Sequence, residues 1–286
     1  MNVLNHKVDF AVVVWVKNAN PNGDPLNGNR PREDYDGFGE ISDVCLKRKI
    51  RNRLQDMGQN IFVQSDDRAT DGFKSLRDRA SGNSALKKAE GEKDKEQYAK
   101  IACESWIDVR SFGQVFAFSS DKKGEGVSVG VRGPVSVHSA ISVLPIQISS
   151  MQITKSVNSE TSEKKSSDTM GTKHRVDYGM YVFYGSINPQ LASKTGFSDT
   201  DAQFIHAALK TLFENDVSSA RPDGSMEVMK MFWWEHNCPS GQYSSAKVHR
   251  LVKVELKKDL DPKQVTSYDI SAAPLEGLIP DVYEGV

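Results

Sequence analysis

The chain has 286 residues, a formal net charge of −1 and 38% hydrophobic residues, which suits one elaborated domain or two small ones with an ample core. Near-neutrality confines any nucleic-acid footprint to local basic patches. Three cysteines without CxxC spacing argue against a disulfide framework or a zinc knuckle and favour a reducing cytoplasm. No secretory signal pattern and no run of eighteen apolar residues occurs, so we expect neither export nor a membrane span.

The first predicted element is a strand over residues 8–16, followed by a long loop. Apolar residues occupy both faces of the strand, which indicates a central position in a sheet. Residues 18–32 are rich in Asn, Gly and Pro, so several positions there are expected to have positive φ. A long loop between a core strand and a helix is usually functional, and this one carries Arg30 and Arg32.

Residues 42–54 predict a helix with one strongly basic face. Ser42 is a suitable N-cap. Four apolar positions fall within one narrow arc at 100° per residue: Leu46, Ile50, Leu54 and Met57. Three cations occupy the opposite arc: Lys47, Arg48 and Arg51. This face is either an ordinary solvated surface or a rail for a nucleic-acid backbone, because phosphates are bound by positioned Lys and Arg.

The middle of the chain predicts a helical insertion and then a β region. Charges of both signs at helical spacing characterise residues 58–100, which we expect to stand off the core. Strands are predicted at 114–118 and 127–137. Gly133 and Pro134 interrupt the second of these, which implies a bulge or a close backbone approach.

A protruding β-hairpin is predicted from residues 143–187. Two β-prone segments, 143–154 and 176–187, flank a polar stretch that ends in a basic cluster. The other interpretation of the polar stretch is a disordered loop.

The C-terminal third predicts one more helix and two strands. Ser198 and Asp201 form a capping box for a helix over 198–215. Residues 227–236 and 247–257 read as strands. The order strand, helix, β region, helix, strand predicts an α+β fold: a ferredoxin-like or RRM-like sheet with two helices on one face and large insertions, within a single elaborated domain over residues 1–286.

Four common catalytic and cofactor-binding motifs are missing from the sequence. It contains no Walker A sequence, no GxGxxG after a strand, no HExxH and no GxSxG. Cys45 lies in the basic helix, where cations lower a thiol pKa, but a packed cysteine is the more economical interpretation. Aromatic residues that could stack bases are more often part of a core: Trp233, Trp234, Tyr178, Tyr181 and Tyr184.

Several motifs together resemble the Cas seven family, and most closely the backbone subunit of the type I-C Cascade of CRISPR systems. They occur in the expected order: Asn20–Pro25, Asn29–Arg32, Ser42–Arg51, Asp108–Gly113, Arg132–Val135, Met170–His174 before Tyr178–Tyr181, and Lys194–Asp199. They extend through residues 8–255. Each motif alone is weak, whereas the ordered set is specific.

This resemblance implies an RRM-like palm, a helical finger insertion at 58–105 and a thumb hairpin at 153–178. It implies that copies of the protein polymerise head-to-tail along a CRISPR RNA, together with other Cascade subunits of the five and eight families. The guide then pairs with target DNA as a heteroduplex. The protein therefore binds the nucleic-acid backbone, and base pairing recognises the target sequence. The expected RNA contacts are Asn20, Asn22, Arg30, Arg32, Lys47, Arg48, Arg51, Arg110, Arg132, Lys173, His174 and Arg175.

The sequence departs from the family pattern at one position and leaves one alternative function open. The family commonly has a proline where this chain has Asp177, so a looser thumb base is expected. The favoured function is a non-catalytic RNA-binding scaffold without a cofactor or a metal. The alternative is a metal-dependent ribonuclease subunit using Asp24 or Asp34, as in type III relatives, although we expect Asp24 to act as a turn-stabilising carboxylate.

Overall fold

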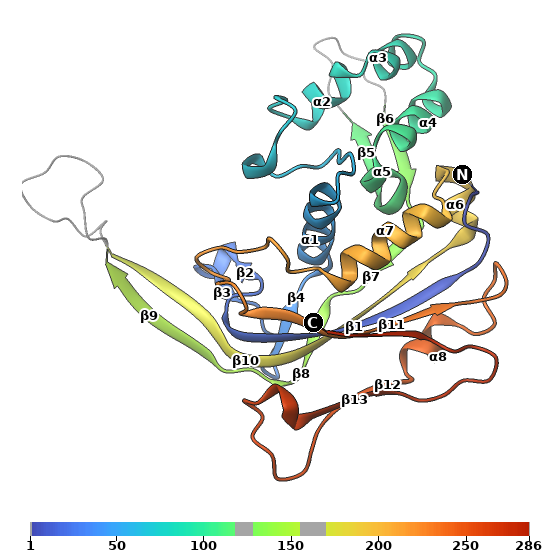
Figure 1. Cartoon of the computed structure of the whole chain (residues 1–286). Helices are drawn as coiled ribbons and strands as arrows, with labels where there is room; N and C mark the ends of the chain where they lie inside the picture. The colour runs from blue at the N-terminus through green and yellow to red at the C-terminus, as the bar shows by residue number, and fades with distance from the viewer. Residues whose placement is uncertain (1, 118–127, 155–169, 286) are drawn as a thin grey trace, which may run out of the picture.

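A computed structural model describes residues 2–117, 128–154 and 170–285. Its main feature is an eight-stranded antiparallel sheet with the order β14-β11-β1-β10-β8-β4, in which β7 and β9 also pair with β10 (Figure 1). The strands are β1 (Val8–Ala19), β4 (Phe38–Ile41), β7 (Val135–Val137), β8 (Ala140–Pro145), β9 (Ile148–Thr154), β10 (Met170–Ile187), β11 (Met226–Glu235) and β14 (Asp281–Glu284). With its helices, the protein is a mixed α and β structure.

Strand β1 is central, as its sequence predicts. It pairs antiparallel with β10 on one side and with β11 on the other. Its residues 8–16 are all buried, which explains why apolar side chains occupy both faces. One face of the sheet contributes to the main core, where Phe10 stacks on Trp233 with ring centroids 5.6 Å apart.

Helices α1 (Asp43–Asp56), α6 (Pro189–Thr195) and α7 (Asp199–Lys210) cover that face (Figure 1). The Ser42 hydroxyl accepts a hydrogen bond from the N–H of Cys45, so the predicted N-cap is confirmed. The predicted capping box is also present, because Ser198 accepts from the Asp201 N–H and the Asp201 carboxylate accepts from the Ser198 N–H. Three residues of the predicted apolar stripe of α1 are buried, Leu46, Ile50 and Leu54, and the fourth, Met57, is partly buried against the same core.

The opposite face of the sheet is covered by the C-terminal segment. It forms α8 (Ser245–His249), β12 (Val252–Leu256), η4 (Val265–Ser267) and β13 (Tyr268–Ala272). The prediction of a strand from residue 247 was therefore wrong at its start, because the Ser244 hydroxyl accepts from the N–H of Lys247 and begins a short helix. In the described residues, no helix is long and apolar enough to cross a membrane.

Above α1 stands a second group of elements, which we call the helical lobe. It contains η2 (Asp66–Arg68), α2 (Leu76–Gly82), α3 (Ser84–Gly91), α4 (Lys95–Ser105), α5 (Ile107–Phe112), β5 (Gly113–Ala117) and β6 (Ser128–Arg132) (Figure 1). It has its own hydrophobic cluster, in which Phe62 packs against Trp106 and Phe116. This cluster extends through Val129, beyond residue 105, where the predicted finger insertion ends.

The lobe returns to the sheet through a close backbone approach. A Cβ atom on Gly133 would lie 2.2 Å from the carbonyl oxygen of Ser111, so only glycine fits between β6 and β7. This confirms the close approach expected from Gly133 and Pro134.

Strands β9 and β10 form a hairpin that projects from the sheet (Figure 1). Their pairing runs from Ile148↔Val176 to Thr154↔Met170. Strand β10 then continues into the sheet, where it pairs with β1. Residues 155–169, which include most of the predicted thumb, lie outside the described residues.

Candidate nucleic-acid interface

The loop after β1 is a small, ordered ribbon. Strand β2 (Gly23–Asp24) pairs with β3 (Arg30–Pro31), and the short helix η1 (Pro25–Asn27) closes the turn between them. Positive φ occurs at Gly28 (58°) and Asn29 (60°), as the turn-forming composition predicts.

The two amide side chains predicted to contact RNA brace this ribbon. The Nδ2 of Asn20, which is buried, donates to the carbonyl of Asn29 at 2.6 Å. The Oδ1 of Asn22 accepts from the backbone N–H of Ser42 at 2.9 Å and from its hydroxyl at 2.8 Å. The amides therefore fix the ribbon against the start of α1.

Arg30 joins the ribbon to the base of the hairpin. Its guanidinium Nη1 donates to the Ser150 hydroxyl at 3.3 Å, and that hydroxyl lies 2.8 Å from Nδ1 of His174. The Arg30 side chain is one-third exposed and lies 3.6 Å from Glu33. The structure thus brings Arg30 and His174, 144 residues apart in sequence, to one junction.

Two further predicted RNA contacts, Arg32 and Lys173, have partners within the chain. Arg32 pairs with Asp24 at 3.3 Å, with about one third of each side chain exposed. Lys173 donates to the carbonyl of Ser219 at 2.6 Å. Arg32 is partly accessible, so the basic side chains on this side of the hairpin base form one basic strip: Arg30, Arg32 and His174. Lys173 precedes His174 on β10, points to the opposite face of the strand and lies outside this strip.

Arg175 lies across the hairpin base from that strip and faces Asp177. Its Nε is 3.8 Å from the Asp177 carboxylate, which also accepts from the Ser149 hydroxyl at 2.9 Å. The backbone N–H of Asp177 donates to the carbonyl of Gln147 at 2.9 Å, a bond that proline could not make. These two bonds brace the hairpin base at Asp177, and the expectation of a looser base there stays a prediction.

Two cations on the basic face of α1 make contacts within the chain. Arg48 donates to the carbonyl of Val63 at 2.7 Å, and burial lowers its pKa from the ordinary value. Arg51 donates to the buried carboxylate of Asp108 at 3.0 Å. Both guanidinium groups are therefore engaged by the helical lobe, because the lobe packs over the helix face that was predicted to be open.

Lys47 and Arg110 are also paired within the chain. Lys47 lies 2.9 Å from Asp43, one helical turn away. Arg110 makes two hydrogen bonds to Asp201, at 2.7 and 3.0 Å, and ties α5 to the capping box of α7. Arg132, in contrast, is exposed at the end of β6.

The loop carboxylates have local structural roles. The Oδ1 of Asp24 accepts from the N–H of Leu26 at 3.1 Å, which confirms the predicted turn-stabilising role. The Oδ1 of Asp34 accepts from the N–H groups of Asp36 and Phe38 at 3.0 and 2.9 Å. Among the described residues, no three His, Cys, Asp or Glu side chains are grouped so that they could hold a metal ion.

Cys45 and most of the aromatic candidates have structural positions. Burial raises the pKa of the Cys45 thiol, although nearby Lys49 and Arg221 oppose this effect, so the thiol is not activated. Three of the aromatic side chains are buried: Trp233, Trp234 and Tyr181. Tyr178 and Tyr184 are partly exposed.

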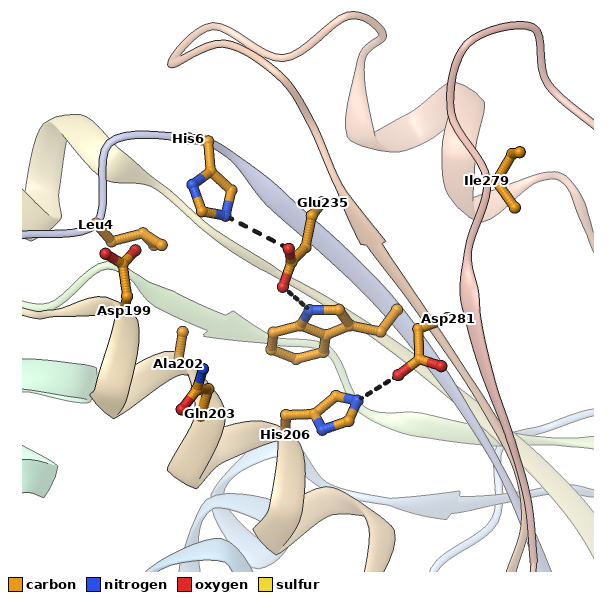
Figure 2. Close-up of a pocket in the computed structure, with 10 residues that line it drawn as sticks. Leu4, His6, Asp199, Ala202, Gln203, His206, Glu235, Ile279 and Asp281 are labelled. Atoms are coloured by element: carbon orange, nitrogen blue, oxygen red, sulfur yellow. Dashed lines mark hydrogen bonds and ion pairs between the residues drawn. The ribbon is translucent and has the colours of Figure 1, made fainter.

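A cavity of about 530 Å³ lies between the start of α7 and strands β11 and β14 (Figure 2). Its lining includes the carboxylates of Asp199, Glu235 and Asp281 and no Lys or Arg. His206 lies 3.2 Å from Asp281, and burial lowers its pKa, with Lys210 adding to the effect. This acidic wall would repel a phosphate, so the cavity does not suit a nucleic-acid backbone.

The structure adds two cations that sequence patterns did not single out. Lys17 and Lys263 line a cavity of about 290 Å³ at the hairpin base, together with Arg175 and Asp177. The position of Lys17 at the end of a core strand is a weak sequence signal. Lys263 has no sequence signal, because only the tertiary fold brings its loop to the hairpin.

Comparisons with known proteins point to one family. The family model described as CRISPR-associated protein Cas7 matches residues 6–273. The CRISPR-associated protein Cas7 of Haloferax volcanii is 27% identical over 233 residues, which cover 77% of this chain and 67% of that protein.

Two similar solved structures are chains of CRISPR RNA-guided surveillance complexes. One, in a pre-nicking state, has a TM-score of 0.47 and 15% identity, covering 80% of this chain and 78% of its own. The other has a TM-score of 0.41 and 16% identity, covering 80% and 68%. Because the family model spans nearly the whole sequence, this chain belongs to the CRISPR-associated protein Cas7 family.

Proposed function

We propose that this protein is a CRISPR RNA-binding backbone subunit of a type I-C Cascade effector complex. Membership of the Cas7 family supports a role in such a complex. The observation that carries the proposal is the basic strip, in which Arg30 from the loop and His174 from the hairpin meet through Ser150. Cations held by two separate elements suit a polyanionic strand that runs across both.

We further propose that the palm is ferredoxin-like, or RRM-like. The order β11-β1-β10-β8 corresponds to 4-1-3-2 when the palm strands are numbered along the chain. Helix α1 follows β1 and α7 precedes β11, and both contribute to the core on one face of the sheet. This connectivity is that of a split βαβ fold, with the helical lobe and the hairpin as insertions.

In this proposal the segment 58–105 is the finger and 153–178 is the thumb. Copies associate head-to-tail on the guide, since a heterologous interface generates an open helix rather than a closed ring. The protein holds the guide backbone while base pairing with target DNA reads sequence. Cascade subunits of the five and eight families complete the assembly.

The test is the nucleic acid that purifies with the full-length protein. We expect guide RNA, identified by sizing and sequencing, and we expect a double variant Arg30→Ala/Arg32→Ala to lose most of it. Each phosphate contact to a single strand contributes about −0.7 to the slope of log affinity against log salt, so this variant should flatten the slope by about 1.4.

The matched control is Lys87→Ala/Lys88→Ala, which removes two exposed cations from α3 of the helical lobe. It should retain RNA as the wild type does. Wild-type protein that purifies without RNA, or a strip variant that retains as much RNA as the control, would contradict the proposal.

A further inference from the structure

The base of the hairpin has basic side chains on both of its faces. Successive residues of a strand point to opposite faces, so His174 and Arg175 diverge. His174 and Ser150 meet Arg30 on the side of the loop ribbon. Arg175 lies on the other side, beside Asp177, where the 290 Å³ cavity opens.

That cavity is formed by three separate parts of the chain. Lys17 and Asn18 come from the end of β1, and Lys263 comes from the loop between β12 and β13. Gln147, Ser149, Arg175, Asp177 and Tyr178 come from the hairpin base. Tyr178 packs with Trp15 and Tyr268 in the cluster beneath β12 and β13, on the face of the sheet opposite α1.

The charges of the lining favour an anion. Three cations, Lys17, Arg175 and Lys263, face one carboxylate, that of Asp177. The Nε of Arg175 and the Oδ1 of Asp177 are both buried and lack a hydrogen-bond partner among the described residues, because their 3.8 Å separation is too long for a hydrogen bond. A buried donor without an acceptor is costly, and an anionic oxygen in the cavity would satisfy it.

The neutral lining residues suit a nucleotide more closely than a free ion. Asn18, Gln147 and Ser149 supply polar groups, and the partly exposed ring of Tyr178 supplies an aromatic surface. Aromatic rings beside cations are the usual elements of single-strand binding, in which a base or sugar packs on the ring. The cavity volume is near the lower limit of small-ligand sites, roughly 300 Å³, which fits one nucleotide unit and no duplex.

We infer that this cavity is a second phosphodiester-binding site, on the hairpin face opposite the basic strip. This inference rests on the proposed function, because the site would bind a nucleic-acid strand that the same protein holds. The phosphodiester belongs either to the guide RNA as it passes around the hairpin or to the target DNA strand recruited by the guide. The chemistry of recognition is the same for both.

The decisive variant is Lys17→Glu/Lys263→Glu in the full-length protein. Binding is measured in two arms: labelled single-stranded RNA on its own, and complementary single-stranded DNA added to the RNA-bound protein. Losing two phosphate contacts should lower affinity on the order of tenfold at 0.1 M salt and flatten the salt slope by about 1.4. A loss in the first arm assigns the site to guide RNA, and a loss in the second arm alone assigns it to the target strand.

Asp177→Asn provides a test of opposite sign. The amide oxygen can still accept from the Ser149 hydroxyl, and the backbone bond to Gln147 is untouched, so the hairpin base should stay intact. Removing the one carboxylate that faces the cations should tighten binding in the same arm that the double variant weakens.

The control is Lys253→Glu, an exposed residue of β12 that does not line the cavity. It should bind as the wild type does. If the wild type and this control bind nucleic acid, and both cavity variants bind equally well in both arms, the inference is overturned and the cavity would suit an acidic protein partner. If the wild type binds no nucleic acid, the proposed function itself fails.

Discussion

The Arg51 side chain connects α1 to the helical lobe through one buried carboxylate. Asp108, whose side chain is 1% exposed, accepts from Arg51 Nε at 3.0 Å and from the backbone N–H groups of Phe62 and Val63 at 2.8 and 3.1 Å. The guanidinium also lies over the ring of Phe112, 5.0 Å from its centroid. A cation in this position holds the helical lobe against α1.

Arg51→Ala should therefore destabilise the protein. It leaves a buried carboxylate without its charged partner, and breaking such a pair costs about 3 kcal/mol. Lys47→Ala, which removes only an i,i+4 pair with Asp43, should cost about 0.4 kcal/mol. Urea denaturation of both variants measures the difference, and equal losses would show that Arg51 is not a structural link.

At the scale of elements, a buried polar cluster holds the C-terminal segment against β1. The carboxylate of Asp9, which is fully buried, lies 3.0 Å from Lys7 Nζ and 2.9 Å from Nε2 of His236. Nε2 of His249 donates to the carbonyl of Gly185 at 3.1 Å and lies 3.6 Å from Asp9. These contacts join β1 and β10 to α8.

This buried polar cluster should stabilise the folded protein less as pH falls. Burial lowers the pKa of His249, with Asp9 opposing the effect. The unfolded chain, with an ordinary His pKa of about 6.5, then binds more protons than the folded one, so stability falls as pH drops below that value. His249→Gln should flatten the decline in unfolding free energy between about pH 6.5 and about pH 5. A decline as steep as that of the wild type would exclude His249 as its source.

Local sequence signals predict the elements well and their contacts poorly. The Ser42 cap and the Ser198–Asp201 capping box depend on residues within one turn, so both are visible in the sequence. Lys49, in the middle of the basic helix, is buried and paired with Asp216, 167 residues away. Such pairings depend on how the lobe and the loops pack, which helical periodicity does not encode.

At the scale of the whole molecule, both faces of the sheet are covered. The helices pack on one face, and β12 with β13 packs on the other. Accessible cations also lie at the edges of the sheet, on the ribbon, at the hairpin base and on the loop between β12 and β13. This arrangement favours the binding of a nucleic-acid strand. The carboxylates of Asp24 and Asp34 accept hydrogen bonds from backbone N–H groups in their own turns.

The scaffold and ribonuclease alternatives differ in one measurable outcome. With magnesium or manganese added, we expect the purified protein to leave both its bound guide and a paired target RNA intact, because phosphodiester cleavage needs an activated water and charge stabilisation at one point. Asp24→Ala should loosen the η1 turn and lower RNA affinity modestly. Metal-dependent cuts that vanish in Asp24→Ala or Asp34→Ala would establish the ribonuclease.

Strand β10 has a mechanical consequence. It is a single strand of 18 residues, about 60 Å long at 3.3 Å per residue, and it serves both as a central strand of the sheet and as one arm of the hairpin. A one-residue slip would turn every buried side chain of β10 to the wrong face, so the strand cannot slide. The hairpin is thus a projecting arm that is fixed at one end in the core. Because β10 cannot slide, a force on the far end of the hairpin bends the arm and is transmitted directly to β1.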